Sequence, residues 1–224
     1  MSDSITVADR PRAATRGPRG RFHLLDASIG ASPRVLLVVA ALCLLPTYFF
    51  PLWNLTMFAP QYGDGLRLHI YSHELDGGNN GQDVREINVL NQYIGMHDLQ
   101  AADFTEFKWM PFVIGALGLL FLRAAVYGQL AQALDVFVMS LYFALFSLWS
   151  FGYKLYRYGH DLAPTAAVKV APFMPPMFGH KKLANFDVYS FPAAGSYALG
   201  AAVVLVMLAF VLGWRRARGS AVEA

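Results

Sequence analysis

The chain has 224 residues, of which 56% are hydrophobic and only 15% are charged. A soluble domain usually carries about 25% charged residues, so this composition excludes an ordinary soluble protein and favours a membrane protein. The formal net charge of +3 is small and gathers at the chain ends, which argues against nucleic-acid binding.

Four apolar segments are long enough to cross a bilayer as helices, because a hydrocarbon core of about 30 Å needs about 20 helical residues. They cover residues 35–53, 107–127, 133–153 and 193–214. We therefore expect an all-α membrane fold built on a bundle of four transmembrane helices. No ionisable side chain lies near the middle of a segment, which argues against a secondary transporter.

The distribution of arginine along the chain predicts the orientation of the protein in the membrane. Ten of the thirteen arginines precede the first apolar segment, follow the last, or lie in the turn between the second and third. The positive-inside rule then places both termini in the cytoplasm. Residues 1–34 are expected to be a disordered basic arm and residues 215–224 a cytoplasmic tail. Since no cleavage site follows the first span, we interpret it as an uncleaved signal anchor.

The first external segment, residues 54–106, has a readable pattern. The stretch GLRLHIYSHEL alternates apolar and polar residues, which predicts a half-buried strand, and GGNNG predicts a turn. A short helix follows, with Asp83 as its N-cap, Glu86 completing a capping box and Gly95 at its end. We expect a strand, turn and helix that form a small α+β module.

The second external segment, residues 154–192, contains five prolines and little periodicity. We interpret it as an extended strap that is rich in aromatic and apolar residues, with Pro192 opening the last helix. A loop this long and apolar is expected to pack against another part of the protein or to lie in the membrane interface. The two segments are therefore expected to form one extracytoplasmic cap.

Histidine and methionine concentrate in these external segments, which hold five of the six histidines and four of the eight methionines. Imidazole and thioether ligands suit copper in an oxidising compartment. The single cysteine, Cys43, lies in the first span and excludes a cysteine metal cluster. The local groupings that we regard as candidate copper ligands are Met96, His97, Met174, Met177 and His180.

Motifs for catalysis are missing. The chain has neither a GxSxG elbow nor a phosphate-binding GxxxxGK[ST] loop. The external carboxylates are explained by helix capping, so we assign no catalytic residue.

Three stretches, in a fixed order along the chain, resemble segments of a known group of proteins. The segments GLRLHIY (65–71), LNQYIGM (90–96) and FMPPMFGHKKLANF (173–186) resemble small bacterial inner-membrane proteins associated with copper and nitrous-oxide respiration gene sets. The resemblance implies an accessory membrane protein. Gln92 departs from it, because those proteins carry histidine there. Asn91, Tyr93 and Gly95 are then expected to be structural residues of the motif.

We expect an accessory protein of the bacterial inner membrane that acts on the outer face, in copper handling or in assembly of a respiratory or copper enzyme. Its expected partners are the lipid bilayer and a membrane or periplasmic protein. One alternative is a non-enzymatic structural subunit of a larger membrane complex, without metal. Another is a small transporter or a membrane oxidoreductase.

Overall fold

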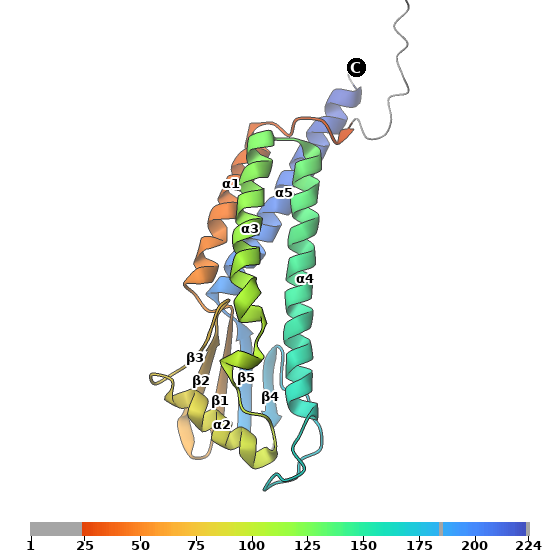
Figure 1. Ribbon diagram of the computed structural model, residues 1–224. Helices are drawn as coiled ribbons and strands as arrows, with labels where there is room; N and C mark the ends of the chain where they lie inside the picture. Colours follow the sequence, from red (N-terminus) through yellow and green to blue (C-terminus); the bar gives the residue numbers. More distant parts are fainter. Residues whose placement is uncertain (1–23, 184–185, 223–224) are drawn as a thin grey trace, which may run out of the picture.

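Four long helices lie side by side, and a five-stranded antiparallel sheet lies at one end of them (Figure 1). The computed structural model describes residues 24–183 and 186–222. The long helices are α1 (Ala31–Cys43), α3 (Glu106–Tyr127), α4 (Leu130–His160) and α5 (Ala194–Val222). Within the described residues, four helical segments are long and apolar enough to cross a membrane. The expectation of four helices long and apolar enough to span a membrane is therefore confirmed, but the fold is mixed α+β and not all-α.

The first helix is shorter than the predicted span of 35–53. Helix α1 ends at Cys43, and a single 3₁₀ turn, η2 (Leu45–Tyr48), follows it. Pro46 accounts for the change, because proline has no N–H to continue the α-helical hydrogen bonds. At the other end, residues 24–30 are ordered, contrary to the expected arm: Ile29 is fully buried, and its N–H donates to the Gly128 carbonyl at 2.9 Å. Residues 1–23 of that arm lie outside the described residues.

Apolar side chains fill the bundle. Leu37 of α1, Phe121 of α3 and Val206 of α5 are almost fully buried in one cluster, and α1 packs mainly against α5 and α3. Helix α4 meets α5 through the stacked rings of Phe137 and Phe210, whose centroids lie 6.1 Å apart. These contacts explain why the bundle forms, because close van der Waals packing between helices stabilises their association in a lipid phase.

The sheet has the strand order β3-β2-β1-β5-β4. Its strands are β1 (Trp53–Ala59), β2 (Tyr62–Ile70), β3 (Leu75–Gly77), β4 (Gly179–Leu183) and β5 (Phe186–Pro192). The predicted strand is confirmed as β2, whose Leu66 and Leu68 are buried. The prediction of an irregular strap over 154–192 is wrong at both ends, because α4 continues to His160 and the strap ends in two strands.

Strand β5 lies within the segment that was predicted to be an irregular strap. Phe186, Val188 and Ser190 are buried while the residues between them are more exposed, so the segment has the period of two that a strand requires. Pro192 is the last residue of β5, and it does not open α5 as predicted. Helix α5 begins two residues later, at Ala194.

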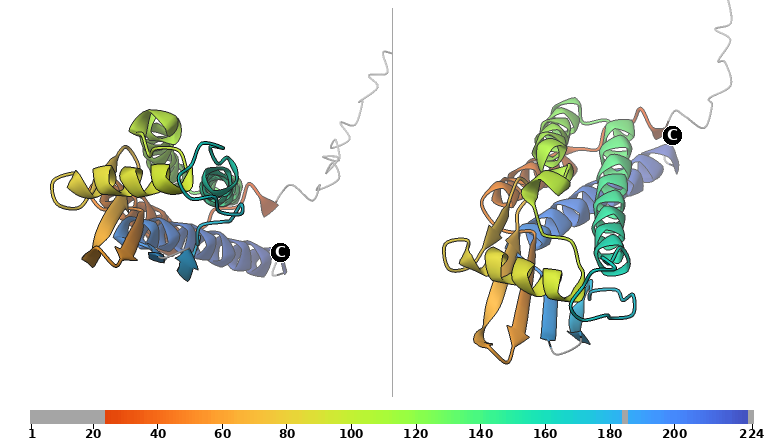
Figure 2. Two further views of the ribbon diagram at one scale, coloured as in Figure 1. Left: turned by 90° about the horizontal axis from the view of Figure 1, so that it is seen from below. Right: turned by 60° about the horizontal axis from the view of Figure 1, so that its bottom comes forward.

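The short helix α2 (Gln82–Ile94) lies across the sheet, as Figures 1 and 2 show. Its buried residues Ile87, Leu90 and Ile94 share an apolar cluster with Leu66 and Leu68 of β2. Burial of this face on the sheet is what stabilises a helix of only 13 residues, which would be marginal alone.

The predicted capping box of α2 is wrong. The N-cap is Gly81 in the left-handed region, without a side-chain cap. Asp83 instead accepts hydrogen bonds from the Arg67 N–H at 2.9 Å and from Asn79 at 2.7 Å, which ties the helix to β2. Glu86 accepts a hydrogen bond from the Tyr62 hydroxyl, and this bond raises the pKa of Tyr62 because the carboxylate disfavours a second negative charge.

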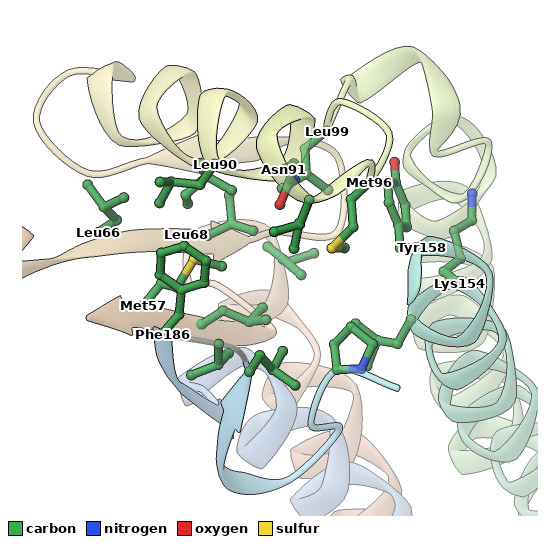
Figure 3. Close-up of a pocket in the computed structure, with 18 of the residues that line it drawn as sticks. Met57, Leu66, Leu68, Leu90, Asn91, Met96, Leu99, Lys154, Tyr158 and Phe186 are labelled. Carbon is green, nitrogen blue, oxygen red and sulfur yellow. The ribbon is translucent and has the colours of Figure 1, made fainter. Parts of the chain in front are cut away.

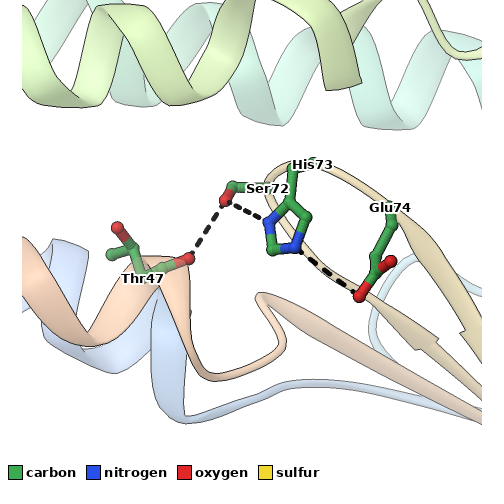
Figure 4. A network of polar contacts seen from close by, with 4 residues as sticks. All are labelled: Thr47, Ser72, His73 and Glu74. Carbon is green, nitrogen blue, oxygen red and sulfur yellow. Dashed lines mark hydrogen bonds and ion pairs between the residues drawn. The ribbon is translucent and has the colours of Figure 1, made fainter.

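Buried hydrogen bonds fasten the sheet to the bundle. The Ser72 hydroxyl, fully buried, donates to the Thr47 carbonyl of η2 at 3.1 Å, and the network continues to His73 and Glu74 (Figure 4). On the α5 side, Ser196 donates to the Leu52 carbonyl at 2.6 Å. The sheet is thus held at a fixed position on the ends of the helices.

Candidate functional site: three cavities that meet at Lys154

Helix α4 carries residues from the bundle into the sheet layer. With 31 residues it is about 46 Å long, whereas a hydrocarbon core is about 30 Å thick. Its last turns therefore extend beyond the other helices and lie beside the sheet, as Figure 1 shows. This length places Lys154, Leu155 and Tyr158 next to the space under α2.

The first cavity, which we call the sheet cavity, lies between the sheet, α2 and the end of α4 (Figure 3). Its volume is about 100 Å³. The lining is almost entirely apolar and includes Met57, Leu68, Leu90 and Phe186. Water has few partners in such a space, so the cavity suits an apolar group.

The second cavity, the bundle cavity, is larger, with a volume of about 390 Å³. It lies among α3, α4 and α5 where they approach β1, and its walls are largely apolar. Leu148 of α4 and Gly200 of α5 line it and are exposed on the outer surface of the bundle. The cavity therefore reaches the surface between α4 and α5.

The third cavity, the outer pocket, has a volume of about 670 Å³ and polar walls. Its lining residues include His97, Asp98, Arg157 and Asp161. Lys154 lines this pocket and both apolar cavities. Met96 and Tyr158 are shared by the sheet cavity and the outer pocket, whereas Ile70, Phe104 and Phe151 are shared by the two apolar cavities.

An ion pair holds Lys154 at this junction. Its Nζ lies 3.1 Å from Glu106 Oε2 at the start of α3, and both side chains are mostly buried, with 23% and 16% exposed. Lys154 also donates to the Asp103 carbonyl at 2.5 Å and lies 4.8 Å from the centre of the Phe104 ring. Ser150, one turn earlier on α4, donates to Glu106 Oε1 at 2.7 Å.

Two buried polar atoms near this junction lack a hydrogen-bond partner among the described residues: Glu106 Oε2 and Ser147 Oγ. Oε2 has the Lys154 ammonium as its ion-pair partner at 3.1 Å. Both residues line the bundle cavity. Buried polar atoms are nearly always paired in folded proteins, so Ser147 Oγ is available for a ligand. Glu106 Oε2 keeps its ion pair with Lys154 and, as a carboxylate oxygen with two lone pairs, can also accept a hydrogen bond from a ligand.

The five predicted copper ligands have different partners in the structure. Met96 and His97 line the outer pocket, and His97 Nε2 lies 3.3 Å from Asp161. His180, on β4, instead hydrogen-bonds Asp187 at 2.8 Å. Met177 lies beside Gly152 of α4, and the Met174 carbonyl accepts a hydrogen bond from Lys181. Within residues 24–183 and 186–222, no group of three or more His, Cys, Asp or Glu side chains is placed to hold a metal ion.

The three motif residues have distinct structural surroundings. Asn91 is buried and its carbonyl accepts from the Met96 N–H at 2.8 Å. The Tyr93 carbonyl accepts a hydrogen bond from Val168 of the strap, although the Tyr93 ring is exposed. Gly95 ends α2 with a φ of 82°. Its carbonyl accepts from the Ala163 N–H at 2.7 Å, so the two external segments do pack together.

Neither Lys154 nor Glu106 is among the candidate site residues predicted from the sequence, and their pairing was not predicted. The sequence did contain an indication that the two helix ends lie together. Glu106 and Ser150 lie equally far from Gly128, the turn between α3 and α4, so an antiparallel helix pair brings them to the same level. Ser147, Ser150 and Lys154 also share one face of α4 by their spacing.

Comparison of the chain with protein-family models, with curated proteins and with solved structures finds no match. The function is therefore inferred from the cavities and their polar junction.

Proposed function

We propose that this protein is an accessory protein of the bacterial cytoplasmic membrane that holds an amphiphilic, lipid-like molecule where the bundle meets the sheet. The observation that carries the proposal is that Lys154 lines two apolar cavities and one polar pocket. An amphiphile has the same division, with an apolar chain and a polar head. The bundle cavity, at about 390 Å³, is within the range of about 300–1,000 Å³ that is usual for ligand sites.

The route of entry supports a ligand that comes from the lipid phase. The bundle cavity reaches the surface between Leu148 and Gly200, on helices that are apolar enough to lie in a membrane. A molecule dissolved in the bilayer would enter sideways between α4 and α5. Its polar part would stay near the Lys154 junction, where charged groups are already paired.

The sheet belongs on the outer side of the membrane in this proposal. Five arginines, Arg34, Arg123, Arg215, Arg216 and Arg218, belong to the helix ends away from the sheet, and the positive-inside rule assigns such an end to the cytoplasm. An impermeant thiol reagent added to intact cells should label a Gly63→Cys variant, at the start of β2, and leave Gly219→Cys unlabelled. The reverse labelling would overturn the orientation.

Two matched glycine variants test lipid binding. A Cβ at Gly200, which lines the bundle cavity, or at Gly219, near the other end of α5, would meet nothing within 4 Å. A Cβ is therefore free of clashes at both positions, which makes Gly200→Phe and Gly219→Phe a matched pair. Native mass spectrometry of washed, detergent-purified protein should show a retained lipid in the wild type and in Gly219→Phe, and a loss in Gly200→Phe. Absence of retained lipid, or equal retention in both variants, would refute the proposal.

Copper handling is a second proposal that one observation favours. Met96 and His97 are adjacent in the chain, and both line the outer pocket, where Asp161 adds a carboxylate. Thioether and imidazole suit Cu(I), although two ligands give only weak binding. Cu(I) retained by the wild type and lost in Met96→Ala/His97→Ala would support this role.

A further inference from the structure

The polar atoms of the bundle cavity restrict which amphiphile fits it. The three serines of α4 differ in the use of their hydroxyl groups. Ser140 donates to the Val136 carbonyl of its own helix, and Ser150 donates to Glu106. Ser147, between them, has no partner within the described residues although its oxygen is buried. Since a helical serine usually bonds the carbonyl four residues earlier when nothing else is in reach, Ser147 is oriented differently from Ser140.

Glu106 determines which kind of hydrogen-bonding group a ligand must place next to it. An ionised carboxylate only accepts hydrogen bonds, so a ligand group next to Oε2 must be a donor. Ser147 Oγ both donates and accepts. A plain acyl chain offers neither function. An ionised phosphate diester head offers only acceptors, so it cannot donate a hydrogen bond to Glu106 Oε2. The pair therefore favours a neutral head group that carries hydroxyl groups.

The other residues of this cavity favour a flat ring. Five aromatic side chains line it: Trp53, Tyr71, Phe104, Phe107 and Phe151. Trp53 and Phe151 are in direct contact, with ring centroids 4.9 Å apart. Aromatic walls of this kind pack well against another planar ring through offset or edge contacts.

We propose that the molecule held in the bundle cavity is a prenylated hydroquinone or a lipid of the same chemistry, with a neutral hydroxylated ring on an apolar chain. Glu106 and Ser147 are the residues that hydrogen-bond its ring hydroxyl groups. The apolar chain leaves between Leu148 and Gly200 toward the lipid. This inference rests on the proposed function, because it names the head group of the amphiphile.

Calorimetric titration of the purified full chain in detergent tests the inference with two ligands. One is a decyl-substituted hydroquinone kept reduced, and the other is its dimethyl ether, which has nearly the same shape but no donor. The hydroquinone should bind about tenfold more tightly, since one hydrogen bond to a charged group is lost in the ether. Equal affinity for the two ligands would overturn the inference without any mutation.

A pair of serine variants locates the contact. Ser147→Ala should weaken hydroquinone binding about five- to tenfold, whereas Ser140→Ala, whose hydroxyl bonds its own helix, should change the affinity less than about twofold. Equal effects would overturn the role of Ser147.

The results of these experiments also distinguish the proposal of lipid binding from the assignment of a hydroquinone ring. If lipid is retained and Gly200→Phe abolishes its retention while the hydroquinone shows no preference, the ring assignment fails and lipid binding stands. If neither lipid nor hydroquinone binds, both fail.

Discussion

Lys154 provides the sharpest test of the energetics at the junction. Lys154→Met removes the 3.1 Å ion pair with Glu106 and the 2.5 Å hydrogen bond to the Asp103 carbonyl, and it leaves a mostly buried carboxylate without its cation. Breaking a fully buried pair costs about 3–5 kcal/mol, whereas exposed pairs contribute about 0–1 kcal/mol. With 23% and 16% of the two side chains exposed, we expect a loss of about 2–3 kcal/mol in the free energy of unfolding.

For a chain of this size, that loss corresponds to a decrease in melting temperature of about 4–12 °C. Thermal unfolding in detergent measures it. Arg157→Met is the control on the same helix, because Arg157 is 63% exposed and lies 3.8 Å from Asp161, so its cost should stay below about 1 kcal/mol. The double variant Glu106→Gln/Lys154→Met should lose less than the sum of the two single losses by about 1 kcal/mol. Similar losses in Lys154→Met and Arg157→Met, or strict additivity, would refute this reasoning.

Two further predictions concern the motif and the metal. Gly95→Ala should destabilise the protein by more than about 1 kcal/mol, because φ is 82° and the new Cβ would lie 2.9 Å from the Ala163 carbonyl oxygen. Gly63→Ala, with open space around it, is the control in the same unfolding assay, and an equal loss there would contradict the role of Gly95. For copper, His97→Ala and His180→Ala should act independently on Cu(I) retention measured by elemental analysis, since the two histidines pair with different carboxylates. Loss of all bound copper in each of the two single variants would show that the histidines share one site.

The sequence predicts the parts of the fold that repeat with a regular period. The four apolar helices follow from their length, and β2 follows from the alternation at Leu66 and Leu68. Gly95 is correctly predicted to end α2, because its left-handed conformation suits glycine. Strands β1 and β5 could not be predicted in the same way. Strand β1 directly follows an apolar span and has no boundary signal of its own, and the prolines around β5 obscure its alternation.

The site was less predictable than the fold, for a physical reason. Glu106, Ser147 and Lys154 are unremarkable as single residues near helix ends, and their importance depends on the register between α3 and α4. The cavities are spaces that remain after helices of unequal length pack against a sheet. Local sequence patterns carry no direct information about such spaces, whereas they do carry it for helix and strand periods.

The most direct test of the central claim uses Trp53 as a reporter of the bundle cavity. Its ring lines that cavity and is only 8% exposed, so a quencher in the surrounding detergent or lipid has little access to it. With Trp109, Trp149 and Trp214 replaced by phenylalanine, an amphiphile with a brominated chain should quench Trp53 fluorescence in a saturable manner. Adding Gly200→Phe should abolish that quenching, whereas Gly219→Phe should preserve it. Quenching that never saturates, or that is the same in both glycine variants, would contradict a ligand site in the bundle cavity.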